Sequence, residues 1–214
     1  MEQFISNEQF NVIKSQINGM QRQAGGTSDE GVKTAVKEAA EAKVHDVFDG
    51  LSEEQRNLIS GVSALETEEE RVKFLMDLTP YRKSFPEVTP ADLRGLFSKV
   101  KKLLIPDLSD IDFRALTYLG WKDLGQSKQY FVYEKDGELK GIQGRYVISA
   151  RKGICSICNR YGDVAMTSIQ NRPRESEGLK SYGQYICYDS KECNQSIQDT
   201  AQLERFLGQV FERK

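Results

Sequence analysis

The feature that most constrains this chain is a set of four cysteines confined to residues 155–193 of a sequence of 214 residues. Their spacing is Cys155-x2-Cys158, then 28 residues, then Cys187-x5-Cys193. Two cysteines three positions apart can turn both sulfurs toward one ion, and a second pair from a distant segment completes a tetrahedron of thiolates. The spacing therefore predicts one structural Zn²⁺ ion bound by all four cysteines.

Other interpretations of the cysteines explain less. A redox Cys-x-x-Cys motif does not need the second pair, and ordinary buried cysteines would not cluster so closely. Disulfides are rare in the reducing cytosol, where we expect the chain because its N-terminal segment lacks the basic and apolar regions of a signal peptide. A catalytic zinc ion would normally use histidine or carboxylate ligands. The chain's one histidine, His45, lies far away on a helix expected to be polar and solvated.

The residues between and after the cysteine pairs predict how the ligands are positioned. Residues 164–169 and 184–188 have the composition of two short strands, separated by a polar loop over 170–180. Asp189-Ser190 can cap a short helix that places Cys193 in or near its first turn. A cysteine knuckle, a hairpin and a helix that carries the last ligand form the treble-clef arrangement. Because so small a region buries little core, we expect its folding to depend on the metal.

Residues 1–106 predict a bundle of amphipathic helices. Each expected helix begins with a residue whose side chain can accept a hydrogen bond from a free backbone N–H group, and apolar residues follow at helical spacing. The last helix should end before Pro106, because a proline restricts the backbone of the residue that precedes it. The five expected N-caps are Ser6, Ser28, Ser52, Thr67 and Thr89.

Residues 107–214 predict an α/β domain. Residues 130–134 and 139–148 are rich in aromatic and β-branched residues, and the Asp136-Gly137 turn between them is typical of a β-hairpin. A further strand is expected over residues 116–121. The predicted fold class is thus α+β, with a helical bundle followed by an α/β domain that ends in a four-cysteine zinc finger.

Charge and composition exclude some functions and weaken others. The net charge is −2 and the sequence pI is about 5.7, whereas a protein that depends on phosphate contacts usually carries a basic excess. Mean hydropathy is −0.56, and no apolar run approaches the roughly 18 residues of a membrane span. The sequence contains no phosphate loop and no nucleophile elbow, so we expect a binding protein rather than an enzyme.

Beyond the cysteine frame, a series of short motifs occurs in a fixed order from about residue 93 to residue 206. With these motifs the chain resembles the FusB-type fusidic acid resistance proteins, also called elongation factor G-binding proteins. The residues that carry the resemblance are Leu96-Phe97-Ser98-Lys99-Val100-Lys101-Lys102, Ile105-Pro106, Gly120-Trp121, Leu139-Lys140-Gly141, Lys152-Gly153, Cys155-Ser156-Ile157-Cys158-Asn159, Tyr185-Ile186-Cys187, Asp189-Ser190 and Cys193-Asn194.

The resemblance implies a function that composition and spacing do not reveal. Proteins of this family bind translation elongation factor G and help it leave ribosomes on which fusidic acid has trapped it, so they protect the drug's target without modifying the drug. The resemblance also suggests a monomer whose zinc-finger domain makes the main contact with the factor. By position, the candidate contacts are Ile154, Tyr182, Tyr185 and Phe206.

Two of the candidate contacts can also be interpreted as core residues. Tyr185 and Phe206 can simply pack around the zinc site, since Phe206 lies in an apolar stripe of the last helix.

A zinc-finger protein that binds RNA or the ribosome is the alternative function, because exposed tyrosines can stack on bases. Basic residues around the zinc-finger loop could steer association with either partner. These residues are Arg160, Arg172, Arg174 and Lys180.

Overall fold

The computed structural model describes residues 2–170 and 181–209 of the chain. They form two compact units, Met1–Lys83 and Ser84–Lys214, which we describe separately. The expected boundary between residues 106 and 107 differs from this division, because the helix that follows Thr89 belongs to the second unit. Its residues Leu93 and Phe97 pack in one buried cluster with Trp121 of the sheet.

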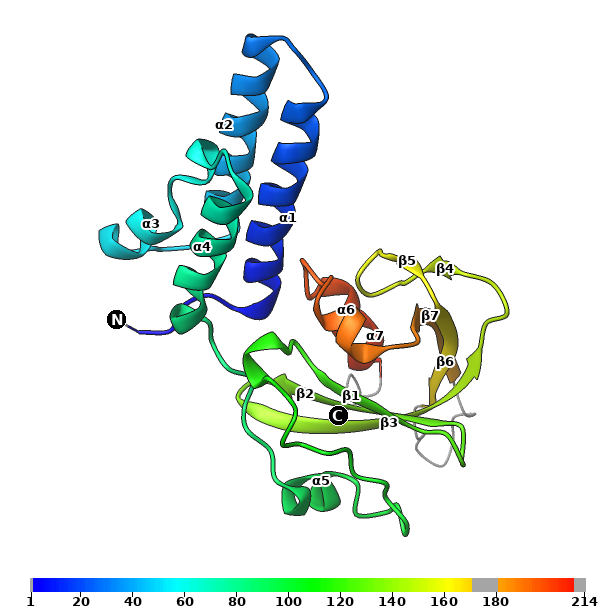
Figure 1. Cartoon of the computed structure of the whole chain (residues 1–214). Helices are drawn as coiled ribbons and strands as arrows, with labels where there is room; N and C mark the ends of the chain where they lie inside the picture. The colour runs from blue at the N-terminus through cyan, green and yellow to red at the C-terminus, as the bar shows by residue number, and fades with distance from the viewer. Residues whose placement is uncertain (1, 171–180, 210–214) are drawn as a thin grey trace. The chain divides into compact units, whose positions relative to one another are not determined.

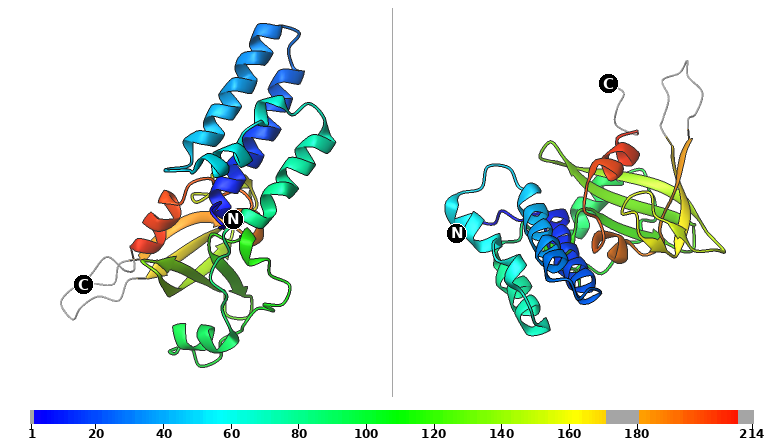
Figure 2. Two further views of the ribbon diagram at one scale, coloured as in Figure 1. Left: turned by 90° about the vertical axis from the view of Figure 1, so that its left-hand side faces the viewer. Right: turned by 90° about the horizontal axis from the view of Figure 1, so that it is seen from above.

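The first unit consists of helices. The helix α2 packs alongside α1 (Figure 2). Capping boxes at Ser6, Ser52 and Thr67 are present as predicted. The second helix begins one residue later than expected, since Asp29 accepts the hydrogen bond from the Val32 amide at 3.1 Å. The elements are α1 (Asn7–Gly25), α2 (Glu30–Asp46), α3 (Glu53–Ile59), η1 (Val62–Ala64), α4 (Glu68–Leu78) and η2 (Thr79–Tyr81).

The core of the first unit lies between these helices. On α2 the core residues are Ala40 and Val44, whereas Val32 at the start of this helix is 47% exposed. His45 is not fully solvated, because its Nε2 lies 3.2 Å from the Ser60 hydroxyl. The buried cluster comprises Ile5, Ile13, Ile17, Met20, Ala40, Val44, Ile59, Val62 and Leu78.

The second unit contains an antiparallel sheet in the order β1-β2-β3-β6-β7 and a separate β4-β5 ribbon. The predicted hairpin is confirmed: Asp136 and Gly137 both have positive φ, as the tight turn between β2 and β3 requires. The strands are β1 (Leu119–Asp123), β2 (Lys128–Lys135), β3 (Glu138–Ile148), β4 (Gly153–Ile154), β5 (Tyr161–Gly162), β6 (Val164–Gln170) and β7 (Ser181–Cys187). The helices are α5 (Pro90–Leu96), η3 (Phe113–Ala115), α6 (Ser190–Asn194) and α7 (Ala201–Gly208).

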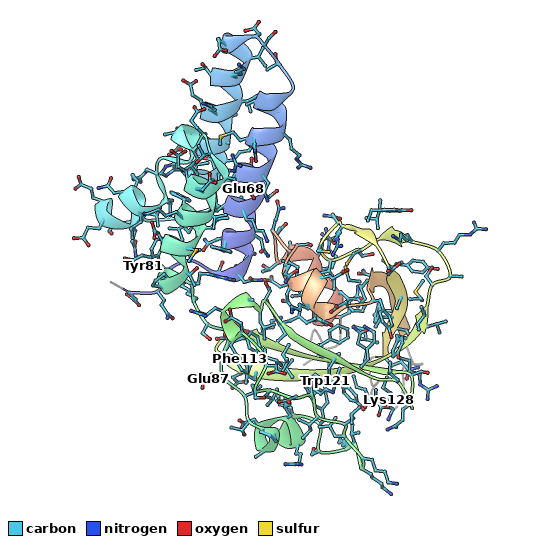
Figure 3. The ribbon with its side chains drawn as sticks, viewed as in Figure 1. Glu68, Tyr81, Glu87, Phe113, Trp121 and Lys128 are labelled. Atoms are coloured by element: carbon cyan, nitrogen blue, oxygen red, sulfur yellow. The ribbon has the colours of Figure 1, made fainter. Side chains whose placement is uncertain are left out.

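Helices lie on both faces of this sheet, with α5 on one side and α6 and α7 on the other (Figure 1). The alternation along β2 explains this arrangement. Tyr130 packs with α5 and with Trp121, which Figure 3 labels on β1, whereas the next residue, Phe131, meets Phe206 of α7. The sheet also packs tightly against the end of α5, because a Cβ atom at Gly141 would lie 3.0 Å from Phe97.

Two further points concern the helices. The α5 helix ends at Leu96, well before the predicted limit at Pro106, and an irregular segment follows it. Among the helices in residues 2–170 and 181–209, none is both long and apolar enough to cross a membrane.

Candidate metal centre

The four cysteine sulfurs converge on one point, and all of them lie within 4.8 Å of one another. The Cys155 and Cys193 sulfurs are 3.9 Å apart, and those of Cys158 and Cys187 are 3.5 Å apart. Four thiolates around a Zn²⁺ ion at about 2.3 Å would be separated by about 3.8 Å, whereas a disulfide would require about 2.05 Å. The predicted set of four ligands is therefore brought together with spacing that fits a tetrahedral zinc ion.

The first pair of ligands lies on a tight turn between β4 and β5. The Asn159 amide donates to the Cys155 carbonyl at 2.9 Å, and the Cys155 amide donates to the Arg160 carbonyl at the same distance. Asn159 closes the turn with φ of 58°, a left-handed conformation that asparagine adopts more readily than most residues. This turn orients both sulfurs to the same side.

The second pair comes from the end of β7 and from α6. The Cys187 amide donates to the Cys155 sulfur at 3.2 Å, so the two halves of the site are joined by a backbone hydrogen bond as well. Asp189 caps α6 by accepting a hydrogen bond from the Lys191 amide at 2.7 Å. Cys193 projects from this short helix. The predicted sequence of knuckle, hairpin and capped helix is confirmed.

The electrostatics of the site favour a bound cation. Hydrogen bonds from the other three thiols hold the pKa of Cys155 far below its ordinary value. The same interactions, together with burial, raise the pKa of Cys187 and Cys193. The pKa of Cys158 is lowered too, so two thiolates are stabilised at the expense of the other two, and four thiolates can coexist only when a cation offsets their mutual repulsion.

Asn194, the residue after the last ligand, braces the site and was not recognised as functional from the sequence. Its side-chain oxygen accepts hydrogen bonds from the Thr117 and Tyr118 amides at 2.7 and 3.2 Å, and its nitrogen donates to the Tyr118 carbonyl at 2.9 Å. These bonds tie α6 to the segment that leads into β1. The Cys193-Asn194 pair was visible as a motif, but a partner 76 residues away leaves no local signal.

The four candidate partner contacts do not share one surface. Ile154 is 63% exposed on β4, and Tyr185 is 46% exposed on β7. Tyr182 is three residues before Tyr185 in the same strand, so its side chain is on the opposite face, where it packs against the buried core. Phe206 is completely buried, with its ring centroid 6.2 Å from that of Phe131.

Phe206 is therefore a core residue in this structure and does not offer a surface to a partner. The physical reason is the apolar stripe of α7, which faces the sheet along its whole length through Leu203, Phe206 and Leu207. Of the basic residues expected near the site, Arg160 forms an ion pair with Glu192 at 2.9 Å. Arg172, Arg174 and Lys180 lie outside the residues that the structure describes.

This geometry defines a treble-clef zinc-finger protein, and comparisons with known families agree. The family model described as "FBP C-terminal treble-clef zinc-finger" matches residues 95–210, and the model described as "Elongation factor G-binding protein, N-terminal" matches residues 4–86. Because the first of these models spans more than half of the chain, the chain belongs to the family of elongation factor G-binding proteins with a treble-clef zinc finger.

A solved structure of a known protein resembles nearly the whole chain. It is titled "Structure of the fusidic acid resistance protein FusC", and it superposes with a TM-score of 0.79 at 28% sequence identity. The similarity covers 96% of this chain and 97% of that one, so both units are included. The predicted relationship to the FusB-type proteins is confirmed. A search of the curated proteins finds no match.

Proposed function

We propose that this protein binds translation elongation factor G and promotes its release from ribosomes stalled by fusidic acid, which gives resistance by protecting the drug's target. The observation that carries the proposal is the pair of family models, which name elongation factor G binding and a treble-clef zinc finger and together match residues 4–86 and 95–210. The similarity to FusC along nearly its full length supports the link to fusidic acid.

In this proposal one zinc ion acts as a scaffold. Four thiolates complete a tetrahedron, so such a site leaves no position for a reacting water or substrate. The site instead fixes the turn that carries Ile154 and holds it against Tyr185, whose carbonyl accepts a hydrogen bond from the Ser156 amide at 2.8 Å. We propose these two exposed side chains as partner contacts, with Tyr182 in a supporting position beneath them.

Release of a trapped factor is a matter of differential binding. A protein that speeds departure of the factor must bind it more tightly in the releasing or released state than in the trapped state. No covalent change to the drug or the factor is needed, so we propose a binding protein without enzymatic activity. It would act as a monomer in the cytoplasm, where translation takes place.

The direct test is to follow elongation factor G on ribosomes stalled with fusidic acid and GDP. Addition of the zinc-loaded protein should accelerate dissociation of the factor, and Tyr185→Ala should reduce the acceleration. If Tyr185→Ala instead loses zinc or melts early, Tyr185 is a structural residue. If the wild-type protein binds the factor without accelerating its departure, the release mechanism is wrong.

The alternative function is binding to RNA or the ribosome itself. Tyr161 is 67% exposed on β5 beside the zinc site, and an exposed aromatic ring can stack on a base. Binding to bare ribosomal RNA with a steep salt dependence, in the absence of the factor, would favour this alternative.

A further inference from the structure

A partly exposed apolar row crosses three strands of the sheet beside the zinc site. Val147 of β3 pairs with Met166 of β6, and Met166 pairs with Tyr185 of β7. Directly paired residues of an antiparallel sheet point to the same face. Val147 is 71% exposed and Tyr185 is 46% exposed, whereas Met166 between them is half-buried. We call Val147, Met166 and Tyr185 the apolar row.

The apolar row lies between two covered parts of the same sheet face. At one end α5 covers Gly141, which lies six residues before Val147 on β3 and on the same face. At the other end the zinc-site ribbon covers the sheet, since a Cβ atom at Gly153 would lie 3.0 Å from Val164 of β6. The row is therefore the part of this face that the second unit's own described elements leave open.

The zinc-site ribbon extends the exposed apolar surface. Ile154 of β4 and Tyr161 of β5 are directly paired and are 63% and 67% exposed. The ribbon is joined to the apolar row through the hydrogen bond from the Ser156 amide to the Tyr185 carbonyl. Two further exposed apolar side chains thus lie on a ribbon that is hydrogen-bonded to β7, the strand that carries Tyr185.

Basic residues accompany this apolar surface. The segment from residue 139 to residue 162 contains five Lys and Arg residues and no Asp or Glu, and two of the five, Lys140 and Arg160, form ion pairs with Glu138 and Glu192 outside it. Arg145 lies two residues before Val147 and on the same sheet face. Arg151 and Lys152 lie in the exposed connection between β3 and β4. The apolar surface therefore has a basic rim.

We propose that the apolar row and the Ile154–Tyr161 pair form one docking surface, and that its occupant is an apolar patch with an acidic rim on elongation factor G. The inference rests on the proposed function and goes beyond the contacts expected from the sequence, because Val147, Met166 and Tyr161 were not among them. It extends the interface over the open face of the sheet and leaves out Phe206 of the last helix, which is buried.

The composition of the surface favours a protein over RNA as the occupant. Val147, Ile154 and Met166 are aliphatic and cannot stack on bases as aromatic rings do. A centre of Met, Tyr and aliphatic side chains with arginine at the rim is instead typical of protein interfaces. The rim predicts that a complementary partner face carries acidic residues, which would raise the association rate at low salt.

The test is titration calorimetry of the full-length, zinc-loaded protein with isolated elongation factor G. Val147→Asp should weaken binding at least tenfold, and Val147→Thr, which keeps the branched shape of the strand residue, should weaken it a few-fold. Leu104→Asp is the matched control, because Leu104 is an apolar residue that is 55% exposed outside the docking surface, where its carbonyl accepts a hydrogen bond from Trp121 of β1, and it should change binding less than twofold. Zinc content and melting temperature of each variant show whether the fold is intact.

Salt dependence provides a second measurement. Arg145→Glu should weaken binding and flatten its dependence on ionic strength, because it removes part of the attraction to the acidic rim. Folded Val147 variants that bind as tightly as the wild type would overturn the docking surface while leaving the proposed function in place. Wild-type protein that does not bind the factor would overturn both. Loss of RNA binding in Val147→Asp, with binding to the factor unchanged, would assign the surface to RNA instead.

Discussion

The two units of this protein are specified by different kinds of interaction. In the first unit the helices begin at capping boxes in which residues three positions apart satisfy each other's backbone groups, as at Ser52 with Gln55. In the second unit the decisive contacts are remote in sequence: Cys155 meets Cys193 across 38 residues, and Asn194 meets Tyr118 across 76. The first unit therefore depends on many small local interactions, and the second on a four-cysteine metal site and a few long-range hydrogen bonds.

The largest effect should come from removing the metal from the second unit. Cys158→Ser, or addition of a strong chelator, should release the zinc and unfold the second unit while the first unit stays largely folded. Structural zinc sites contribute roughly 10–16 kcal/mol at pH 7, which is comparable to or larger than the total stability of most domains. Zinc analysis and near-UV circular dichroism would follow the second unit, and helical ellipticity the first. Retained zinc stoichiometry in Cys158→Ser would contradict the four-cysteine site.

The next largest effect should come from the brace at Asn194. Asn194→Ala would remove three hydrogen bonds to the Thr117 and Tyr118 backbone, so we expect a loss of about 3 kcal/mol in the free energy of unfolding of the zinc-loaded protein. Denaturant unfolding measures this loss. Gln195→Ala, at the exposed next position, is the control and should change little. Equal effects of the two substitutions would show that the Asn194 hydrogen bonds contribute little to the free energy of unfolding.

A smaller effect should follow from removing one cap in the first unit. Thr67→Ala deletes the acceptor of the Glu70 amide at the start of α4 and should cost about 1 kcal/mol. Thr34→Ala, on the exposed surface of α2, is the matched control and should not destabilise the unit. Thermal unfolding followed by helical ellipticity would distinguish them. Complete unfolding of the first unit in Thr67→Ala would contradict the view that this unit depends on many small interactions, because it would show that a single contact dominates its stability.

The smallest effect concerns pH. Burial raises the pKa of Glu41, but hydrogen bonds from the Ser63 and Gly61 amides outweigh it and leave this pKa below the ordinary 4.5. Because the folded pKa is the lower one, the stabilisation is complete above pH 4.5 and is lost as the pH falls through the folded value. Nuclear magnetic resonance shifts of the Gly61 and Ser63 amides should titrate below pH 4.5 in the wild type. They should not do so in Glu41→Gln, whereas Glu38→Gln on the same helix should leave the titration intact.

The contrast between local and long-range interactions also explains which parts of the fold the sequence predicts. Three capping boxes, the Asp136-Gly137 hairpin and the Asp189 cap are local patterns, and each appears in the structure where it was expected. The zinc ligands are long-range, yet cysteines are few enough for their spacing to reveal the site. Local patterns and rare residues are thus the parts of the fold that a single sequence reports.

Features that depend on tertiary packing were not predicted. The helix α5 has the signals of a bundle helix, but its partner Trp121 lies on the sheet, so it belongs to the second unit. Phe206 has the same apolar spacing whether its helix faces a partner or the core, and the structure buries it. The open sheet face was also missed, because the pairing of Val147, Met166 and Tyr185 requires the register of three strands.

If the zinc ion organises the surface that binds elongation factor G, removal of the ion should abolish binding. The most direct test is titration calorimetry of the full-length protein into elongation factor G from the same organism, first zinc-loaded and then after chelation. We predict one-to-one binding by the loaded protein and loss of that binding when the zinc is removed. Undiminished binding by the zinc-free protein, or no binding by the loaded protein at high concentration, would contradict the account.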